Sequence, residues 1–193
     1  MRKKTAAPGR LELVREFVNT YDVEDDVEGL ASATALGAWL HEHGLASAGV
    51  RASRADLTRA IELREALRSI LLAHNGTPAA APAAPAAAVL DASAIRARLQ
   101  LRFDEQGHSW LEPAAGGIHG ALGQLLVIVH TAIADGTWER LKACREHACE
   151  FAFYDHTKNR SGTWCNMEVC GNRAKARAYR QRRDLTKPAE AKA

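Results

Sequence analysis

CREHACEFAFYDHTKNRSGTWCNMEVC, residues 144–170, contains all four cysteines of the 193-residue chain. Cys144 and Cys149 form one pair and Cys165 and Cys170 a second, with four residues inside each pair and fifteen between the pairs. Zinc prefers a tetrahedron of thiolates, and two short loops brought together by a hairpin supply that geometry. The spacing therefore predicts one structural Zn²⁺ bound by the four cysteines.

Disulfides and a mixed ligand set are the alternatives. Paired cysteines in a chain without a secretory signal more often bind metal than form disulfides, and no apolar run follows the basic start of this chain. His147 and His156 could each replace a thiolate, although four cysteines already fill the coordination shell. A filled shell leaves no position for a reactive water, so we expect the zinc to support folding rather than catalysis.

The residues between and after the cysteine pairs favour a treble-clef-like zinc finger. Residues 151–154 are typical of a strand, residues 156–162 of a turn, and Thr163–Trp164 of a return strand that delivers Cys165. Cys170 then lies at the start of a helix, where backbone N–H groups and the helix dipole suit a thiolate. The predicted finger spans residues 141–185, and residues 186–193 are expected to form a flexible tail.

The charge of the chain is divided unevenly. Residues 1–140 hold 14 Lys and Arg against 17 Asp and Glu, whereas residues 141–193 hold 12 against 6, so the two parts carry −3 and +6. Six of the eleven residues 173–183 are basic and none is acidic, which indicates either a solvated tail or a helix that follows phosphates. The predicted nucleic-acid contacts are Arg173, Lys175, Arg177, Arg180, Arg182 and Arg183.

The residues before the finger predict a helix-rich α+β domain, residues 1–138. Helices are expected from Ser32 or Thr34 to Gly44, from Ser53 to about His74, and from Gly117 to about residue 135, the last with an apolar face that includes Ile133. Residues 99–103 and 108–111 predict a β-hairpin. Residues 75–88, rich in Ala and Pro, predict an insert or flexible connection.

Arg64 and Arg68 fall on the apolar stripe of the second helix, one turn apart. A buried guanidinium needs an acceptor, so one of the two side chains is expected to reach water and the other to pair with a carboxylate such as Asp22 or Asp56. The alternative hypothesis is that both line a pocket for a small anionic ligand together with Asn19.

Several segments resemble known families. The finger, with Phe153-Tyr154-Asp155, Trp164-Cys165-Asn166-Met167 and the run from Cys170 to Lys175, resembles the CGNR zinc-finger family. The upstream part, with residues 17–20, 38–40 and 63–67, resembles the ABATE domain that precedes this finger in bacterial proteins. The resemblance implies a stress-associated transcription regulator whose finger binds DNA and whose N-terminal domain acts as a sensor. One departure is Gly162-Thr163, where the family usually shows two arginines.

The combined expectation is a cytoplasmic regulator, associated with the nucleoid, that binds DNA through the finger. Docking to an acidic protein and binding to single-stranded RNA, with stacking by Tyr154, Trp164 or Tyr179, remain the alternatives. The longest apolar run, residues 125–129, is too short to predict a membrane span. The sequence contains no catalytic motif that would predict an enzyme. A homo-oligomer is compatible with the sequence, which shows no dimer face.

Overall fold

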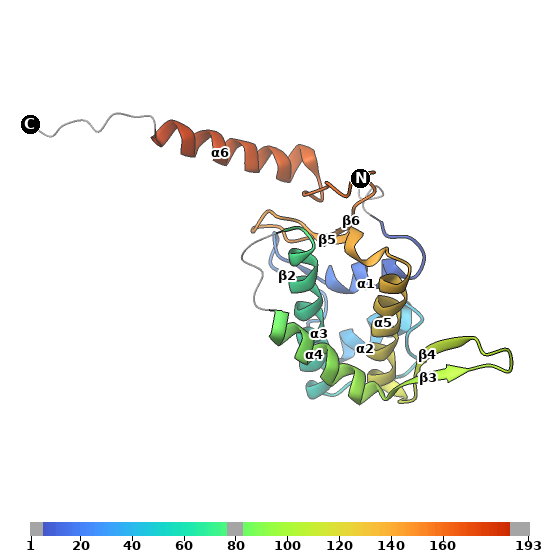
Figure 1. Cartoon of the computed structure of the whole chain (residues 1–193). Coiled ribbons are helices and arrows are strands. Elements are labelled where there is room, and N and C mark those ends of the chain that lie inside the picture. The colour runs from blue at the N-terminus through green and yellow to red at the C-terminus, as the bar shows by residue number, and fades with distance from the viewer. Residues whose placement is uncertain (1–5, 77–82, 186–193) are drawn as a thin grey trace, which may run out of the picture.

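The computed structural model describes residues 6–76 and 83–185 and has the predicted α+β architecture (Figure 1). Within these ranges the helices are α1 (Leu11–Val18), α2 (Ala33–Glu42), α3 (Arg54–Ala73), α4 (Ala83–Ala97), α5 (Gly117–Ala134) and α6 (Asn172–Leu185). Three antiparallel hairpins accompany them: β1 (Tyr21–Asp22) with β2 (Val27–Glu28), β3 (Leu99–Phe103) with β4 (Ser109–Pro113), and β5 (Leu141–Ala143) with β6 (Ala152–Tyr154).

The first two predicted helices are confirmed together with their caps. The Ser53 hydroxyl accepts a hydrogen bond from the Asp56 N–H (3.1 Å), and the Asp56 carboxylate accepts one from the Ser53 N–H (2.9 Å), so α3 begins with a capping box. The Ser32 hydroxyl caps α2 by accepting from the Ala35 N–H (3.1 Å). Gly44, with a φ of +67°, adopts the left-handed conformation that ends this helix.

The Ala/Pro-rich segment is helical where the structure describes it. Residues 77–82 of the predicted connection lie outside the described residues, but α4 begins at Ala83, so the prediction of a flexible connection is wrong for residues 83–88. Alanine has the highest helix propensity, and Pro85 lies in the first turn, where a missing N–H removes no helical hydrogen bond. α4 packs against both α3 and α5.

Helix α5 is the most apolar helix of the core. Leu125 and Val129 are buried, whereas Ile133 is 55% exposed, so the prediction that the buried apolar face includes Ile133 is wrong. By length and mean hydropathy α5 is able to cross a membrane, but more than half of it is buried inside the protein, which is the pattern of a core helix.

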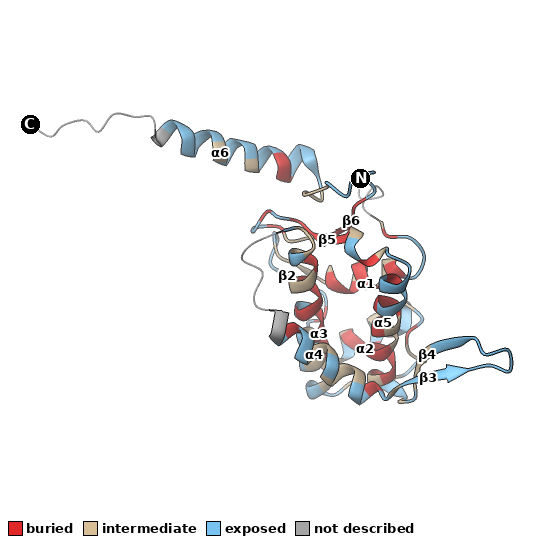
Figure 2. Ribbon diagram, viewed as in Figure 1, coloured by how far each residue is buried: buried red, intermediate tan, exposed pale blue. Residues whose placement is uncertain are grey.

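One hydrophobic core joins the N-terminal helices to the strands of the finger (Figure 2). Leu141 lies opposite Tyr154 and Ala143 opposite Ala152, and all four belong to the same buried cluster as Phe17 of α1. The predicted return strand is wrong, since residues 163–164 form no strand and β6 pairs with β5, which precedes the first cysteine. The core therefore continues across the predicted domain boundary at residues 138–141.

Candidate zinc centre and basic helix

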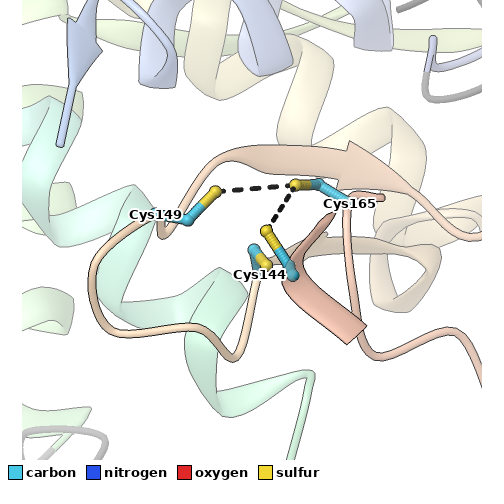
Figure 3. A group of neighbouring side chains, drawn as sticks. Cys144, Cys149 and Cys165 are labelled. Atoms are coloured by element: carbon cyan, nitrogen blue, oxygen red, sulfur yellow. Dashed lines mark hydrogen bonds between the residues drawn. The ribbon is translucent and has the colours of Figure 1, made fainter. Parts of the chain in front are cut away.

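The four predicted ligands converge on one point. All four Sγ atoms lie within 4.8 Å of one another and none forms a disulfide (Figure 3). The Cys165 Sγ lies 3.5 Å from that of Cys149 and 3.8 Å from that of Cys170. A tetrahedron with Zn–S bonds of about 2.3 Å has edges of about 3.8 Å, so the sulfurs have the spacing that zinc requires. The donor set fits one structural zinc ion, and the disulfide alternative is wrong.

The thiols need a cation to ionise together. Hydrogen bonds from Cys149 and Cys165 lower the pKa of Cys144, while the hydrogen bond to Cys144 raises the pKa of Cys165, and burial raises the pKa of Cys170. Without a metal, one thiolate is thus stabilised at the expense of its neighbours. A divalent ion removes this competition and allows four thiolates to coexist.

The histidine alternatives do not join the metal centre. His147 is exposed on the loop between the first two cysteines, and the group of converging donor atoms contains only the four sulfurs. The His156 Nε2 lies 2.8 Å from the Ala6 carbonyl oxygen, so this ring is engaged with the start of the chain.

Backbone turns present each cysteine pair. In the first loop the Cys149 N–H donates to the Glu146 carbonyl (2.8 Å), which folds the intervening residues back on themselves. In the second, Asn166 precedes a π-helical turn, Met167–Gly171, and its side-chain oxygen accepts hydrogen bonds from the backbone N–H groups of residues 168 and 169. The Cys170 N–H donates to the Asn166 carbonyl (2.9 Å), which fixes the last ligand at the entrance of α6.

The two residues after Cys170 make close contacts within the same turn. A Cβ on Gly171 would lie 2.4 Å from the Met167 sulfur, so no larger residue fits without displacing that side chain. The Asn172 amide donates to the Glu168 carbonyl (2.9 Å), which satisfies a backbone acceptor where the π-helical turn changes into an α-helix.

Asp155 organises the loop between β6 and the second cysteine pair. Its carboxylate, in a residue 2% exposed, accepts hydrogen bonds from Thr157, from the Gly162 N–H and from the Lys142 ammonium (2.8 Å). Burial would raise the pKa of Asp155, but these donors outweigh it and lower the pKa to about 2. A Cβ on Gly162 would lie 2.7 Å from the carboxylate, so this loop has no room for an arginine at that position.

Two arginines of α6 pair with carboxylates that the sequence analysis did not identify. Arg173 forms an ion pair with Glu24 of the β1–β2 turn (2.6 Å). Arg177 forms a two-point ion pair (2.9 and 2.5 Å) with Glu146, whose side chain is 3% exposed and whose pKa it lowers. Glu146 is an acidic residue inside the first cysteine loop, in an otherwise basic part of the chain. Both arginines therefore hold α6 in place, and their guanidinium groups are engaged within the chain.

The opposite side of α6 is exposed (Figure 2). Because successive helical residues rotate by 100°, Lys175 and Arg182 face away from Arg173 and Arg177. The helix extends away from the body of the protein (Figure 1). Its exposed basic residues include Lys175, Arg180, Arg182 and Arg183.

The aromatic residues of the finger are unequally accessible. Tyr154 is only 8% exposed and belongs to the core, and Trp164 is half-buried against the cysteine cluster. Tyr179 of α6 is 60% exposed. Of the three side chains that were expected to stack on RNA bases, Tyr179 thus lies on the surface and Tyr154 is buried.

The Arg64 side chain is bonded within the chain. It forms a two-point ion pair with Glu28 (2.6 and 2.8 Å) and a hydrogen bond to Glu65 (2.7 Å), and the residue is 3% exposed. Burial would lower the pKa of Arg64, but the two carboxylates outweigh it and raise the pKa. A carboxylate partner is present as expected, but it is Glu28 and Glu65 rather than Asp22 or Asp56. The expectation that one of the two arginines reaches water is wrong, since Arg64 and Arg68 are each 3% exposed.

Arg68 and Asn19 connect the N-terminal helices to the finger. The Arg68 guanidinium donates to the carbonyls of Val18 (2.8 Å) and Glu150 (3.3 Å). The Asn19 amide donates to the Ala152 carbonyl (2.9 Å) and accepts from its N–H (2.8 Å), as a neighbouring strand would. These donors bind acceptors inside the chain, so the contacts of Asn19, Arg64 and Arg68 do not support the hypothesis of a pocket for an anionic ligand.

Known families match both parts of the chain. The family described as CGNR zinc finger matches residues 140–183. The ABATE family, described as "Putative stress-induced transcription regulator", matches residues 11–143, which is more than half of the chain. No curated protein matches the sequence. The chain therefore belongs to the ABATE family of putative transcription regulators and carries a CGNR zinc finger with one structural zinc site.

Proposed function

We propose that this protein is a cytoplasmic, zinc-dependent DNA-binding regulator of transcription, and that α6 contacts the phosphates of duplex DNA. The exposed basic residues of α6, Lys175, Arg180, Arg182 and Arg183, are the observation that carries the proposal, and Lys175 and Arg182 among them lie on the side away from Arg173 and Arg177. The zinc centre fixes the start of this helix, and the ion pair between Arg177 and Glu146 fixes its direction. Arg173 and Arg177 are positioning residues in this scheme.

The dimensions of α6 suit the major groove. An α-helix is about 10–12 Å wide and the major groove about 12 Å wide, so one helix fits between the phosphate rows. Lys175 and Arg182 are about 10 Å apart along the helix axis at a rise of about 1.5 Å per residue. Two cations on one side of the helix can contact two phosphates at the same time, whereas a single acidic side chain on a protein partner would pair with only one of them.

Affinity for duplex DNA across a salt series tests this proposal. For the zinc-loaded protein we expect log affinity to fall against log salt with a slope of about three or more, because each neutralised phosphate contributes about 0.9. Replacing Lys175 and Arg182 by alanine is expected to lower the slope by about 1.8 and the affinity by about tenfold or more in 0.1 M salt.

The matched control replaces two exposed arginines far from α6 in the sequence, Arg54 and Arg96, by alanine. This variant loses the same charge, and its slope should equal that of the wild type. Equal losses of DNA affinity in both variants would mean that net charge alone explains the effect, and would contradict a role for α6. Absence of binding at low salt would instead favour an acidic protein partner, and stronger competition by single-stranded RNA than by duplex would favour RNA.

A further inference from the structure

Arg173 and Arg177 hold α6 through ion pairs that differ in their exposure to water. Arg177 binds Glu146 at two points, and the Glu146 side chain is only 3% exposed, so salt has little access to its carboxylate. In the pair between Arg173 and Glu24 (2.6 Å) the two side chains are 44% and 38% exposed. Salt screens exposed ion pairs more strongly than buried ones, and exposed pairs contribute little to stability. Arg173 is therefore the arginine of the two that readily exchanges its partner.

Glu24 belongs to the turn between β1 and β2, which carries three consecutive exposed carboxylates, Glu24, Asp25 and Asp26. The Asp22 carboxylate accepts hydrogen bonds from the backbone N–H groups of Glu24 (3.0 Å) and Asp25 (3.3 Å), which sets the shape of the turn. The Tyr21 hydroxyl donates to Asp26 (2.8 Å). Within the described residues Glu24 is the one of the three exposed carboxylates that forms an ion pair with α6.

The base of this turn is fixed by the core of the N-terminal domain. The Arg64 guanidinium binds both carboxylate oxygens of Glu28, at the end of β2 (2.6 and 2.8 Å), and the Gly29 N–H donates to the Thr20 carbonyl (2.7 Å). A Cβ on Gly29 would lie 2.8 Å from the Thr20 oxygen, so the two ends of the turn are in close contact. Glu24 is thus presented to α6 by a turn whose ends are bonded to each other and to α3.

We propose that Glu24 masks Arg173 from duplex DNA, so that the N-terminal domain limits the affinity of the basic helix. This inference rests on the proposed function, because it assigns a regulation to the same helix. A guanidinium pairs with a carboxylate and with a phosphate through the same planar donors, so Glu24 and a DNA phosphate compete for Arg173. The exposed carboxylates of the turn also repel a phosphate that approaches the start of α6.

The position of Arg173 on α6 suits a second row of phosphates. At 100° per residue, Arg173 and Arg180 lie within about 20° of each other, and Lys175 and Arg182 lie on the roughly opposite side of the helix. A helix in the major groove has a phosphate row on each side, so the two pairs of cations would face different rows. Glu24 therefore blocks one contact with the second row and leaves the contacts of Lys175 and Arg182 unchanged.

The variant Glu24→Gln, measured beside Asp25→Asn, tests the mask. The control removes the same charge from the next residue of the same turn. In a salt series with the zinc-loaded full chain and duplex DNA, Glu24→Gln is expected to raise the affinity about threefold or more in 0.1 M salt and to steepen the slope by about 0.9, the value of one phosphate contact. Asp25→Asn should leave the slope unchanged. Glu24→Gln combined with Arg173→Gln should lose the gain, because the unmasked cation is then absent.

A second measurement reports on the ion pair without nucleic acid. Phenylglyoxal modifies accessible guanidinium groups, and mass spectrometry of the peptides gives the rate of modification at each arginine. Arg173 should react about two- to fivefold faster in Glu24→Gln than in the wild type, which is the factor by which an exposed ion pair shifts the population of its free form. Asp25→Asn should leave the rate at Arg173 unchanged, and Arg177 should react equally in all three proteins.

Each result decides a different step of the proposal. An unchanged rate at Arg173 would mean that the ion pair does not form in solution, and would overturn the mask. A faster rate without a gain in affinity would overturn it while leaving DNA binding by the wild type in place. Equal gains in the two single variants would also overturn it, since the general acidity of the turn would then explain them. If neither the wild type nor Glu24→Gln bound duplex DNA at low salt, the proposed function would fail and the mask with it, although the modification rates would still report the ion pair.

Discussion

Replacement of Cys170 by serine is expected to abolish zinc binding and to lower the melting temperature of the whole chain by about 10–20 °C. Serine does not supply a thiolate, and structural zinc stabilises small modules by about 10–16 kcal/mol. Loss of even about 5 kcal/mol corresponds to about 10–20 °C in a chain of this size. The effect should extend beyond the finger, because β5 and β6 are buried in the same cluster as Phe17 of α1.

Zinc content and hydrogen exchange measure the two parts of this prediction separately. The metal content of the variant should fall from one zinc per chain to none, and amides of α1 should lose protection together with those of β6. The control is His147→Ala, which changes an exposed residue of the first cysteine loop and should keep both the metal and the melting temperature. A Cys170→Ser protein that retains zinc would contradict the ligand assignment, and one with an unchanged α1 would contradict the shared core.

The features that could be predicted from sequence are those set by local spacing. The cysteine pairs define the metal centre because a tetrahedral site needs only four donors on two short loops. The cap residues Ser32 and Ser53 each bind a backbone N–H three residues away, so the helix starts can be predicted from the sequence. The run from Cys170 to Arg173 is equally local, and its glycine and asparagine are explained by contacts within a single turn.

The features that could not be predicted depend on residues far apart in the chain. Glu28, Glu24 and Glu146 lie far in sequence from the arginines that they bind, which are Arg64, Arg173 and Arg177, respectively. Charge composition alone does not show whether such an arginine binds a distant carboxylate or a phosphate. The partner of β6 is hidden for a similar reason, because this strand pairs with β5, which precedes the first cysteine. The start of α4 was missed because alanine and proline together suggest a linker, while the alanines themselves favour a helix.

Arg68→Ala is expected to destabilise the protein by about 3–5 kcal/mol, because each buried acceptor that loses its donor costs about 1–3 kcal/mol. The Arg68 guanidinium donates hydrogen bonds to the Glu65 carboxylate (3.0 Å) and to the carbonyls of Val18, Tyr21 (3.2 Å) and Glu150. Its side chain is 4% exposed. Alanine would leave these carbonyls without a donor inside the protein and would also open a cavity. Thermal unfolding at neutral pH, with a fall of about 2–4 °C per kcal/mol, measures the loss.

The matched control lies on the same helix. Arg59 pairs with Asp56 at 3.4 Å, but its side chain is 36% exposed, so Arg59→Ala should change the stability by less than about 1 kcal/mol. Arg68→Lys should recover only part of the loss, because an ammonium group keeps the charge but does not reproduce the planar set of donors. If Arg68→Ala were as mild as Arg59→Ala, the buried network would not be the main support of this part of the core.

The same substitution also tests whether the N-terminal helices hold the zinc centre closed. The carbonyl that Arg68 binds belongs to Glu150, the residue directly after the ligand Cys149, and Asn19 pairs with Ala152 two residues further on. Weakening this connection should let the first cysteine loop open more often, so a chelator should remove zinc faster from Arg68→Ala than from the wild type under conditions where both are folded. Equal release rates would mean that the loop is held by the metal alone. A faster rate would show that the stability of the regulator domain and the occupancy of its zinc finger are physically linked.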